Sequence, residues 1–102
     1  MSKKKINHIS KTSEKFLELY LNTASLTGFE SAGQKVWLDY IKPYIDSHIV
    51  DTYGSVVGVI NSEAKYKVVI EAHADEISWF VHYITEKGFI YLRRNGGSDH
   101  QI

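Results

Sequence analysis

The segment Ala72-His73-Ala74-Asp75-Glu76 holds the residues best suited to chemistry in this chain of 102 residues. In an extended backbone, His73 and Asp75 project to the same side, because strand side chains repeat every two residues. One imidazole nitrogen can then bind a metal ion while the carboxylate orients the ring, as is usual for metal-bound histidines. A lone His-x-Asp triplet is a weak motif, and a solvated loop histidine is its commoner explanation.

The composition narrows the kind of site and partner. The chain has no cysteine, which excludes a disulfide scaffold, a thiolate zinc site and a cysteine nucleophile. Twelve Lys+Arg balance twelve Asp+Glu, so no net charge attracts nucleic acid or an anionic membrane surface. The apolar runs are far shorter than a membrane-spanning helix requires, and no export signal is readable. We therefore expect no nucleic-acid partner, no membrane association and a cytoplasmic location.

Two helices are expected in the first half of the chain to position this segment. Apolar residues at helical spacing predict a helix over residues 12–23 and a second over about 28–42. The residues expected to cap or end these helices are Thr12 or Ser13, Thr27 with Glu30 as a capping box, and Pro43.

The second half has the composition of β-strands. The expected strands are 48–52, 55–60, 66–72, 77–85 and 89–94. The continuous apolar run Val68-Val69-Ile70 indicates burial on both faces and hence a central strand, and the strand 77–85, with two apolar faces, is expected to be central as well. Lys87-Gly88 predicts a hairpin between the last two strands. Two helices lying on one face of this sheet give an α+β or mixed α/β domain.

The remaining candidate residues are better explained by structure than by chemistry. Glu71 is either a partner of the histidine or a surface residue, and Glu76 is expected to be structural. The other histidines, which lack a carboxylate at metal-binding spacing, are His8, His48, His82 and His100. Trp37, Tyr40 and Tyr44 have helical spacing and are expected to pack in a core.

Several short motifs occur in one order along the chain. They are Thr27-Gly28-Phe29-Glu30, Asp51-Thr52-Tyr53-Gly54, Glu71-Ala72-His73-Ala74-Asp75-Glu76-Ile77, Lys87-Gly88-Phe89-Ile90 and Asn95-Gly96-Gly97. This series resembles the amino-terminal part of the glutamyl aminopeptidase-like metallopeptidases, cytoplasmic enzymes that form tetrahedral dodecamers. The resemblance covers residues 16–97. It departs from the family at three places, where this chain has Leu26-Thr27, Ser55 and Ser78.

The resemblance implies a fold of two amino-terminal helices on a mixed β-sheet, the first part of a zinc-aminopeptidase catalytic domain. Residues 1–95 would belong to that domain. Residues 96–102 would begin the linker to a dimerisation domain that is missing from this chain.

The resemblance also implies a chemistry. His73 would be a metal ligand and Asp75 the catalytic acid that supports it, in a site with two divalent ions, zinc or cobalt. Peptides would be the substrates, cleaved at their amino-terminal residues, and the complete protein would be a homo-oligomer. The other ligands and a general base come from later sequence in the family, so this chain is expected to be inactive alone. The alternative is a non-catalytic binding or assembly module, or a decayed remnant, that has kept this part of the fold.

Overall fold

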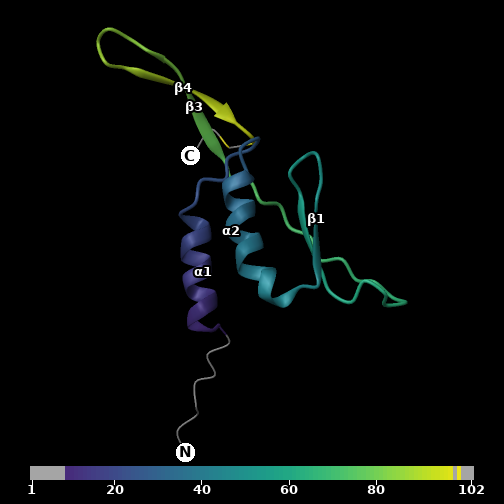
Figure 1. Cartoon of the computed structure of the whole chain (residues 1–102). Coiled ribbons are helices and arrows are strands. Elements are labelled where there is room, and N and C mark those ends of the chain that lie inside the picture. Colours follow the sequence, from purple (N-terminus) through teal and green to yellow (C-terminus); the bar gives the residue numbers. More distant parts are fainter. Residues whose placement is uncertain (1–8, 98, 100–102) are drawn as a thin grey trace, which may run out of the picture.

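The computed structural model describes residues 9–97 and 99, which form two helices followed by two β-hairpins (Figure 1). The elements are α1 (Lys11–Leu21), α2 (Ser31–Ile41), the 3-10 turn η1 (Lys42–Tyr44), β1 (Ser47–Val50), β2 (Val56–Val59), β3 (Ser78–Ile84) and β4 (Ile90–Asn95). The predicted mixed α/β class is confirmed. Neither helix is long and apolar enough to cross a membrane.

Helix α1 begins one residue before its predicted start. Its N-cap is Ser10, whose Oγ accepts a hydrogen bond from the backbone N–H of Ser13 at 3.1 Å, so the predicted caps at Thr12 or Ser13 were wrong. The helix packs against α2 through stacked rings of Phe16 and Tyr40, whose centroids are 3.9 Å apart. Tyr40 thus packs between the helices, but Tyr44 is 65% exposed and no described hydrophobic residue is buried, so the core expected for these aromatic residues is not formed.

Helix α2 begins at Ser31, three residues after the predicted start. Gly28 has a φ of +86°, a left-handed conformation that a helix cannot include. The predicted capping box is not formed, because the Thr27 hydroxyl donates to Asp75 instead and Glu30 Oε1 accepts from the Gly28 N–H. As predicted, the α-helix ends before Pro43, which lies in η1.

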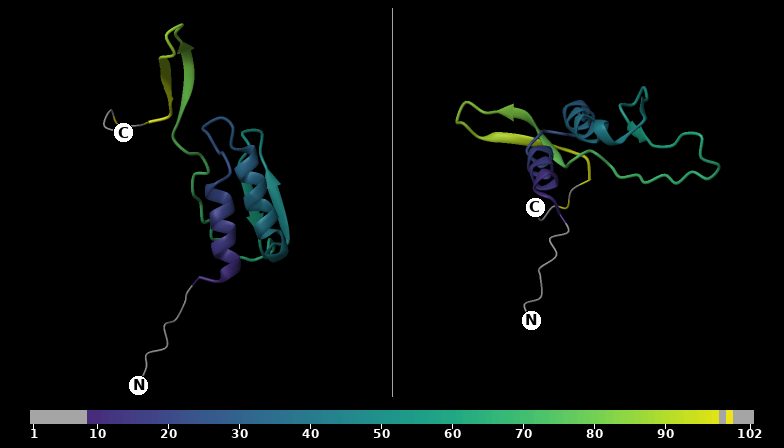
Figure 2. Two further views of the ribbon diagram at one scale, coloured as in Figure 1. Left: turned by 90° about the vertical axis from the view of Figure 1, so that its left-hand side faces the viewer. Right: turned by 60° about the horizontal axis from the view of Figure 1, so that its bottom comes forward.

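The first hairpin, β1–β2, packs on α2. Its strands are antiparallel, with Ser47 opposite Val59. A Cβ atom on Gly58 would lie 2.7 Å from Ile41 Cδ1 and 3.0 Å from Ile45 Cγ2, so the glycine lets the hairpin approach the end of the helix closely. Figure 2 shows α1, α2 and this hairpin as successive layers.

The second hairpin, β3–β4, projects away from the helices (Figures 1 and 2). The strands are antiparallel, with Ser78 opposite Asn95 and an irregularity between Val81 and Tyr83. Gly88 at the turn has a φ of +82°, which explains why the Lys87-Gly88 pair indicated the turn correctly. Strand β3 was expected to be central, but among the described residues it pairs only with β4.

The strand predicted over residues 66–72 is absent from the described structure, where this segment is extended and unpaired. Val68, Val69 and Ile70 are 89%, 79% and 95% exposed, so the prediction of a buried central strand was wrong for this chain. The apolar run favours an extended backbone, but a strand forms only where a neighbouring strand supplies hydrogen-bond partners. The described strands accordingly form two separate two-stranded sheets.

The apolar faces of these elements are largely uncovered. Among the described residues, no hydrophobic residue is buried. The radius of gyration is 19.2 Å, against about 13 Å for a compact domain of this length. The accessible surface is 9652 Å², against about 5,900 Å² for a folded protein of this mass. The chain therefore has the secondary structure of a domain without an enclosed core.

Candidate functional site

The candidate site is formed where three parts of the chain meet. They are the α1–α2 loop, residues 73–78, which contain the His73–Asp75 pair, and the end of β4. The α1–α2 loop and the segment are joined at Ser25, which is only 5% exposed. Its Oγ donates to the carbonyl of Ala74 at 2.7 Å, and its N–H donates to Glu76 Oε1 at 3.0 Å. The Glu76 N–H donates back to the Ser25 carbonyl at 2.8 Å. The expected structural role of Glu76 is confirmed by these bonds.

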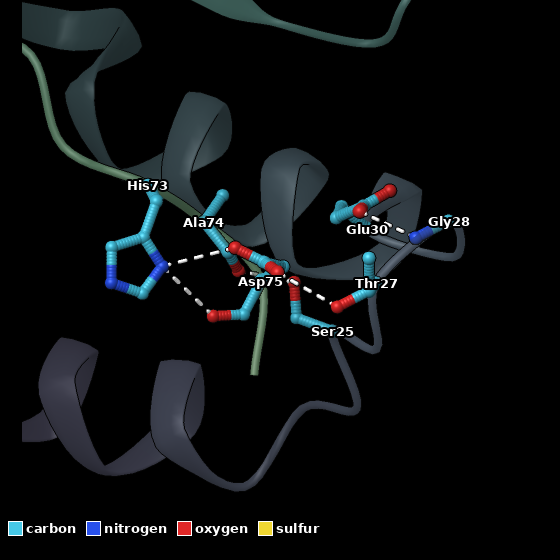
Figure 3. A network of polar contacts seen from close by, with 7 residues as sticks. All are labelled: Ser25, Thr27, Gly28, Glu30, His73, Ala74 and Asp75. Atoms are coloured by element: carbon cyan, nitrogen blue, oxygen red, sulfur yellow. Dashed lines mark hydrogen bonds and ion pairs between the residues drawn. The ribbon is translucent and has the colours of Figure 1, made fainter. Parts of the chain in front are cut away.

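The contact expected between His73 and Asp75 is present (Figure 3). Nδ1 of His73 lies 3.0 Å from Asp75 Oδ1 and 3.1 Å from the Asp75 carbonyl oxygen. Both partners are acceptors, so Nδ1 must carry the proton when the ring is neutral. Nε2 then has a free lone pair, and in Figure 3 it points away from Asp75.

The second oxygen of the Asp75 carboxylate is held from the opposite side. Thr27 Oγ1 donates to Asp75 Oδ2 at 2.7 Å. This hydrogen bond, followed by the one from His73, lowers the pKa of Asp75 from its ordinary value of 3.8. The carboxylate is therefore ionised at neutral pH and acts only as an acceptor, which fixes the direction of both hydrogen bonds.

The histidine is exposed and suited to bind one metal ion. Its side chain is 86% exposed, while that of Asp75 is 36% exposed. An open Nε2 with a carboxylate behind Nδ1 is the common arrangement of a metal-binding histidine. Within residues 9–97 and 99, no group of three or more His, Asp or Glu residues could hold an ion. The described residues thus offer one ligand to a metal, and not a complete site.

A shallow cavity of about 220 Å³ lies beside the histidine, between the carboxyl end of α1 and residues 73–76. Tyr20, Leu21 and Thr23 line its α1 side. The cavity is mostly apolar, so it adds no further metal ligand to the pair.

The other candidates lie apart from this site. Glu71 is exposed, and His48 and His82 are exposed on the two hairpins. His8 and His100 lie outside the described residues, as does most of the expected linker over 96–102.

Three residues that sequence reasoning did not assign to the site are part of it: Ser25, Thr27 and Asn95. Asn95 Nδ2 donates to the carbonyl of Thr27 and to Ser78 Oγ, both at 3.0 Å. Thr27 was expected to be a helix cap, and it lies 48 residues before Asp75. Local spacing offers no signal for such a contact. Whether Thr27 reaches Asp75 depends on the path of the chain between the two residues.

Comparison with known proteins agrees with the motif series. The sequence pattern of the M42 glutamyl aminopeptidase family matches residues 54–102, which include the His73–Asp75 pair. A protein of Acetivibrio thermocellus to which an aminopeptidase function is ascribed is 32% identical over 81 residues, or 79% of this chain. This chain is therefore similar to the M42 aminopeptidases over most of its length.

A solved structure extends the likeness to three dimensions. The TET aminopeptidase of the marine sediment archaeon Thaumarchaeota archaeon SCGC AB-539-E09 matches 89% of this chain with a TM-score of 0.74 and 26% identity. This chain spans 24% of the Acetivibrio relative and 26% of the archaeal chain. It therefore corresponds to about a quarter of either protein.

Proposed function

We propose that this chain is the amino-terminal part of the catalytic domain of a metal-dependent aminopeptidase that removes amino-terminal residues from peptides. Residues 1–95 would belong to that domain, and residues 96–102 would lead to a second domain. The observation that supports this function is the His73–Asp75 pair, in which Nε2 of His73 is open to a metal ion, in a chain similar to the M42 aminopeptidases.

M42 peptidases are metallopeptidases. The open Nε2 of His73, with Asp75 behind Nδ1, fits one metal ion as a ligand. Two divalent ions, zinc or cobalt, would activate a water molecule and polarise the scissile carbonyl when bound. His73 would bind one of them through Nε2. Asp75 would hold the proton on Nδ1 and keep the ring in the orientation that binding requires.

The described residues would not complete this chemistry by themselves. They offer one ligand, whereas an ion in a protein site needs several, and their apolar surfaces are uncovered. We infer that the remaining ligands, the general base and the covering strands come from the rest of the catalytic domain. The chain by itself would be inactive, and the cytoplasmic homo-oligomer would be a property of the complete protein.

One experiment tests this function. The protein is purified from its source, and its intact mass, its content of divalent metal and its turnover of amino-acid anilides are measured. A mass well above 11.7 kDa with about two metal ions per chain and measurable turnover supports the proposal. A mass of 11.7 kDa with neither metal nor turnover contradicts it and favours a non-catalytic module.

A further inference from the structure

We propose that Thr27 is a positioning residue of this site. Its hydroxyl holds the carboxylate of Asp75 so that the free oxygen stays on Nδ1 of His73 and Nε2 stays open. This inference rests on the proposed function, in which His73 binds a metal ion. It concerns a residue of the α1–α2 loop, far from Asp75 in the sequence.

The two oxygens of one carboxylate have separate tasks. Oδ2 of Asp75 accepts from Thr27 at 2.7 Å, and Oδ1 faces His73 Nδ1 at 3.0 Å (Figure 3). The terminal torsion of an aspartate is broad, so a carboxylate held by one partner alone can rotate. The second hydrogen bond removes that freedom and keeps Oδ1 on the imidazole.

Thr27 is itself held in place. Asn95 at the end of β4 donates to the carbonyl of Thr27 and also to Ser78 Oγ at the start of β3. The next residue, Gly28, turns the chain with its positive φ and donates to Glu30. The peptide group between Thr27 and Gly28 is thus held at both its carbonyl and its N–H, and the Thr27 hydroxyl is directed to Asp75 instead of capping α2.

Attachment of the loop to the site segment does not depend on Thr27. Ser25 provides that attachment through three hydrogen bonds to Ala74 and Glu76. Substituting Thr27 by valine would remove the hydroxyl and keep the shape of the side chain. The orientation of Asp75 can therefore be changed while the loop stays attached.

The test uses the full-length protein with Thr27→Val, Thr27→Ser and Thr23→Val. Thr23 is the matched control, because its hydroxyl lies in the same region and donates to the Leu19 carbonyl, whereas that of Thr27 donates to Asp75. The dissociation constant for Zn²⁺ is measured by calorimetry. The ring ¹⁵N shifts of His73, which distinguish the Nδ1–H from the Nε2–H tautomer, are measured in the metal-free protein at pH 8.

We expect Thr27→Val to weaken Zn²⁺ binding about 10- to 100-fold, the usual effect of losing a group that supports a ligand. The His73 ring should then change from the Nδ1–H form to a mixture of both tautomers. In Thr27→Ser and Thr23→Val, the dissociation constant for Zn²⁺ and the ring ¹⁵N shifts of His73 should stay close to those of the unsubstituted protein.

Two outcomes overturn the inference. One is an unchanged tautomer and Zn²⁺ affinity in Thr27→Val, and the other is an equal loss in Thr23→Val, which would indicate a general structural effect. If the unsubstituted protein binds no Zn²⁺ and hydrolyses no peptide, the proposed function fails. The tautomer comparison still decides whether Thr27 positions Asp75.

Discussion

Ser25 lies so close to Gly33 that a Cβ atom on the glycine would be 2.7 Å from Ser25 Oγ and 3.0 Å from Ser25 Cβ. The same Oγ donates to the carbonyl of Ala74, next to His73. Gly33 is the one buried residue of α2. Helix α2 therefore supports the site segment through a contact that only a residue without a side chain permits.

Gly33→Ala is predicted to destabilise the protein by about 1–3 kcal/mol, because the new methyl group overlaps Ser25. At an unconstrained helix position the same change stabilises by about 0.5–1 kcal/mol, so the sign of the effect identifies the contact. The measurement is the free energy of unfolding in urea. The double variant Ser25→Ala/Gly33→Ala should recover part of the loss. A Gly33→Ala variant more stable than the original would contradict the close approach.

His73→Ala is predicted to reduce metal affinity and aminopeptidase turnover by at least about 100-fold in the complete enzyme, because a ligand matters no less than a group that supports it. Metal content and turnover of an amino-acid anilide are measured together. His82→Ala, at an exposed position of β3, is the matched control and should leave both nearly unchanged. Equal losses in both variants would disprove a specific role of His73.

The stability of the turn between β1 and β2 is predicted to depend on pH through the ionisation of Asp51. Asp51 Oδ1 accepts from the N–H groups of Ser55 at 2.9 Å and Tyr53 at 2.8 Å, and these bonds, chiefly that of Ser55, lower the pKa of Asp51 below 3.8. A lowered pKa in the folded state stabilises the turn at pH values above 3.8, and this contribution is lost as the pH falls through the folded pKa.

NMR titration of the Ser55 amide checks this expectation. Its shift should change with a midpoint below 3.8, and Asp51→Asn should abolish the change. Glu86→Gln, in the turn of the other hairpin, should not affect it. A midpoint at or above 3.8 would show that the turn does not stabilise the ionised carboxylate.

The exposed run Val68-Val69-Ile70 is predicted to be a paired strand in the complete protein. Apolar side chains on both faces favour burial between layers, and the uncovered surface here leaves room for such neighbours. Hydrogen exchange should find these three amides protected, in contrast to that of Glu63 in the adjacent exposed turn. Exchange as rapid as that of Glu63 would contradict the pairing.

The two helices, the second hairpin and the His73–Asp75 contact were predicted, because each depends on neighbours close in the sequence. Helical spacing, the turn at Gly88 and the two-residue repeat of an extended chain are local properties. Apart from the shifted starts of α1 and α2, the errors concern partners distant in the sequence. The hydroxyl of Thr27 was assigned to its nearest helix, and residues 66–72 were assigned to a sheet that the described chain does not form.

The sequence alone thus indicated the similarity to M42 aminopeptidases, both helices, four of the five expected strands and the pair of residues that could bind a metal ion. Only the tertiary structure showed that Thr27 meets Asp75, 48 residues away, and Asn95, 68 residues away. The physical reason is that a hydroxyl or an amide can satisfy its hydrogen bonds with many partners. Which partner it contacts is decided by the path of the backbone between them.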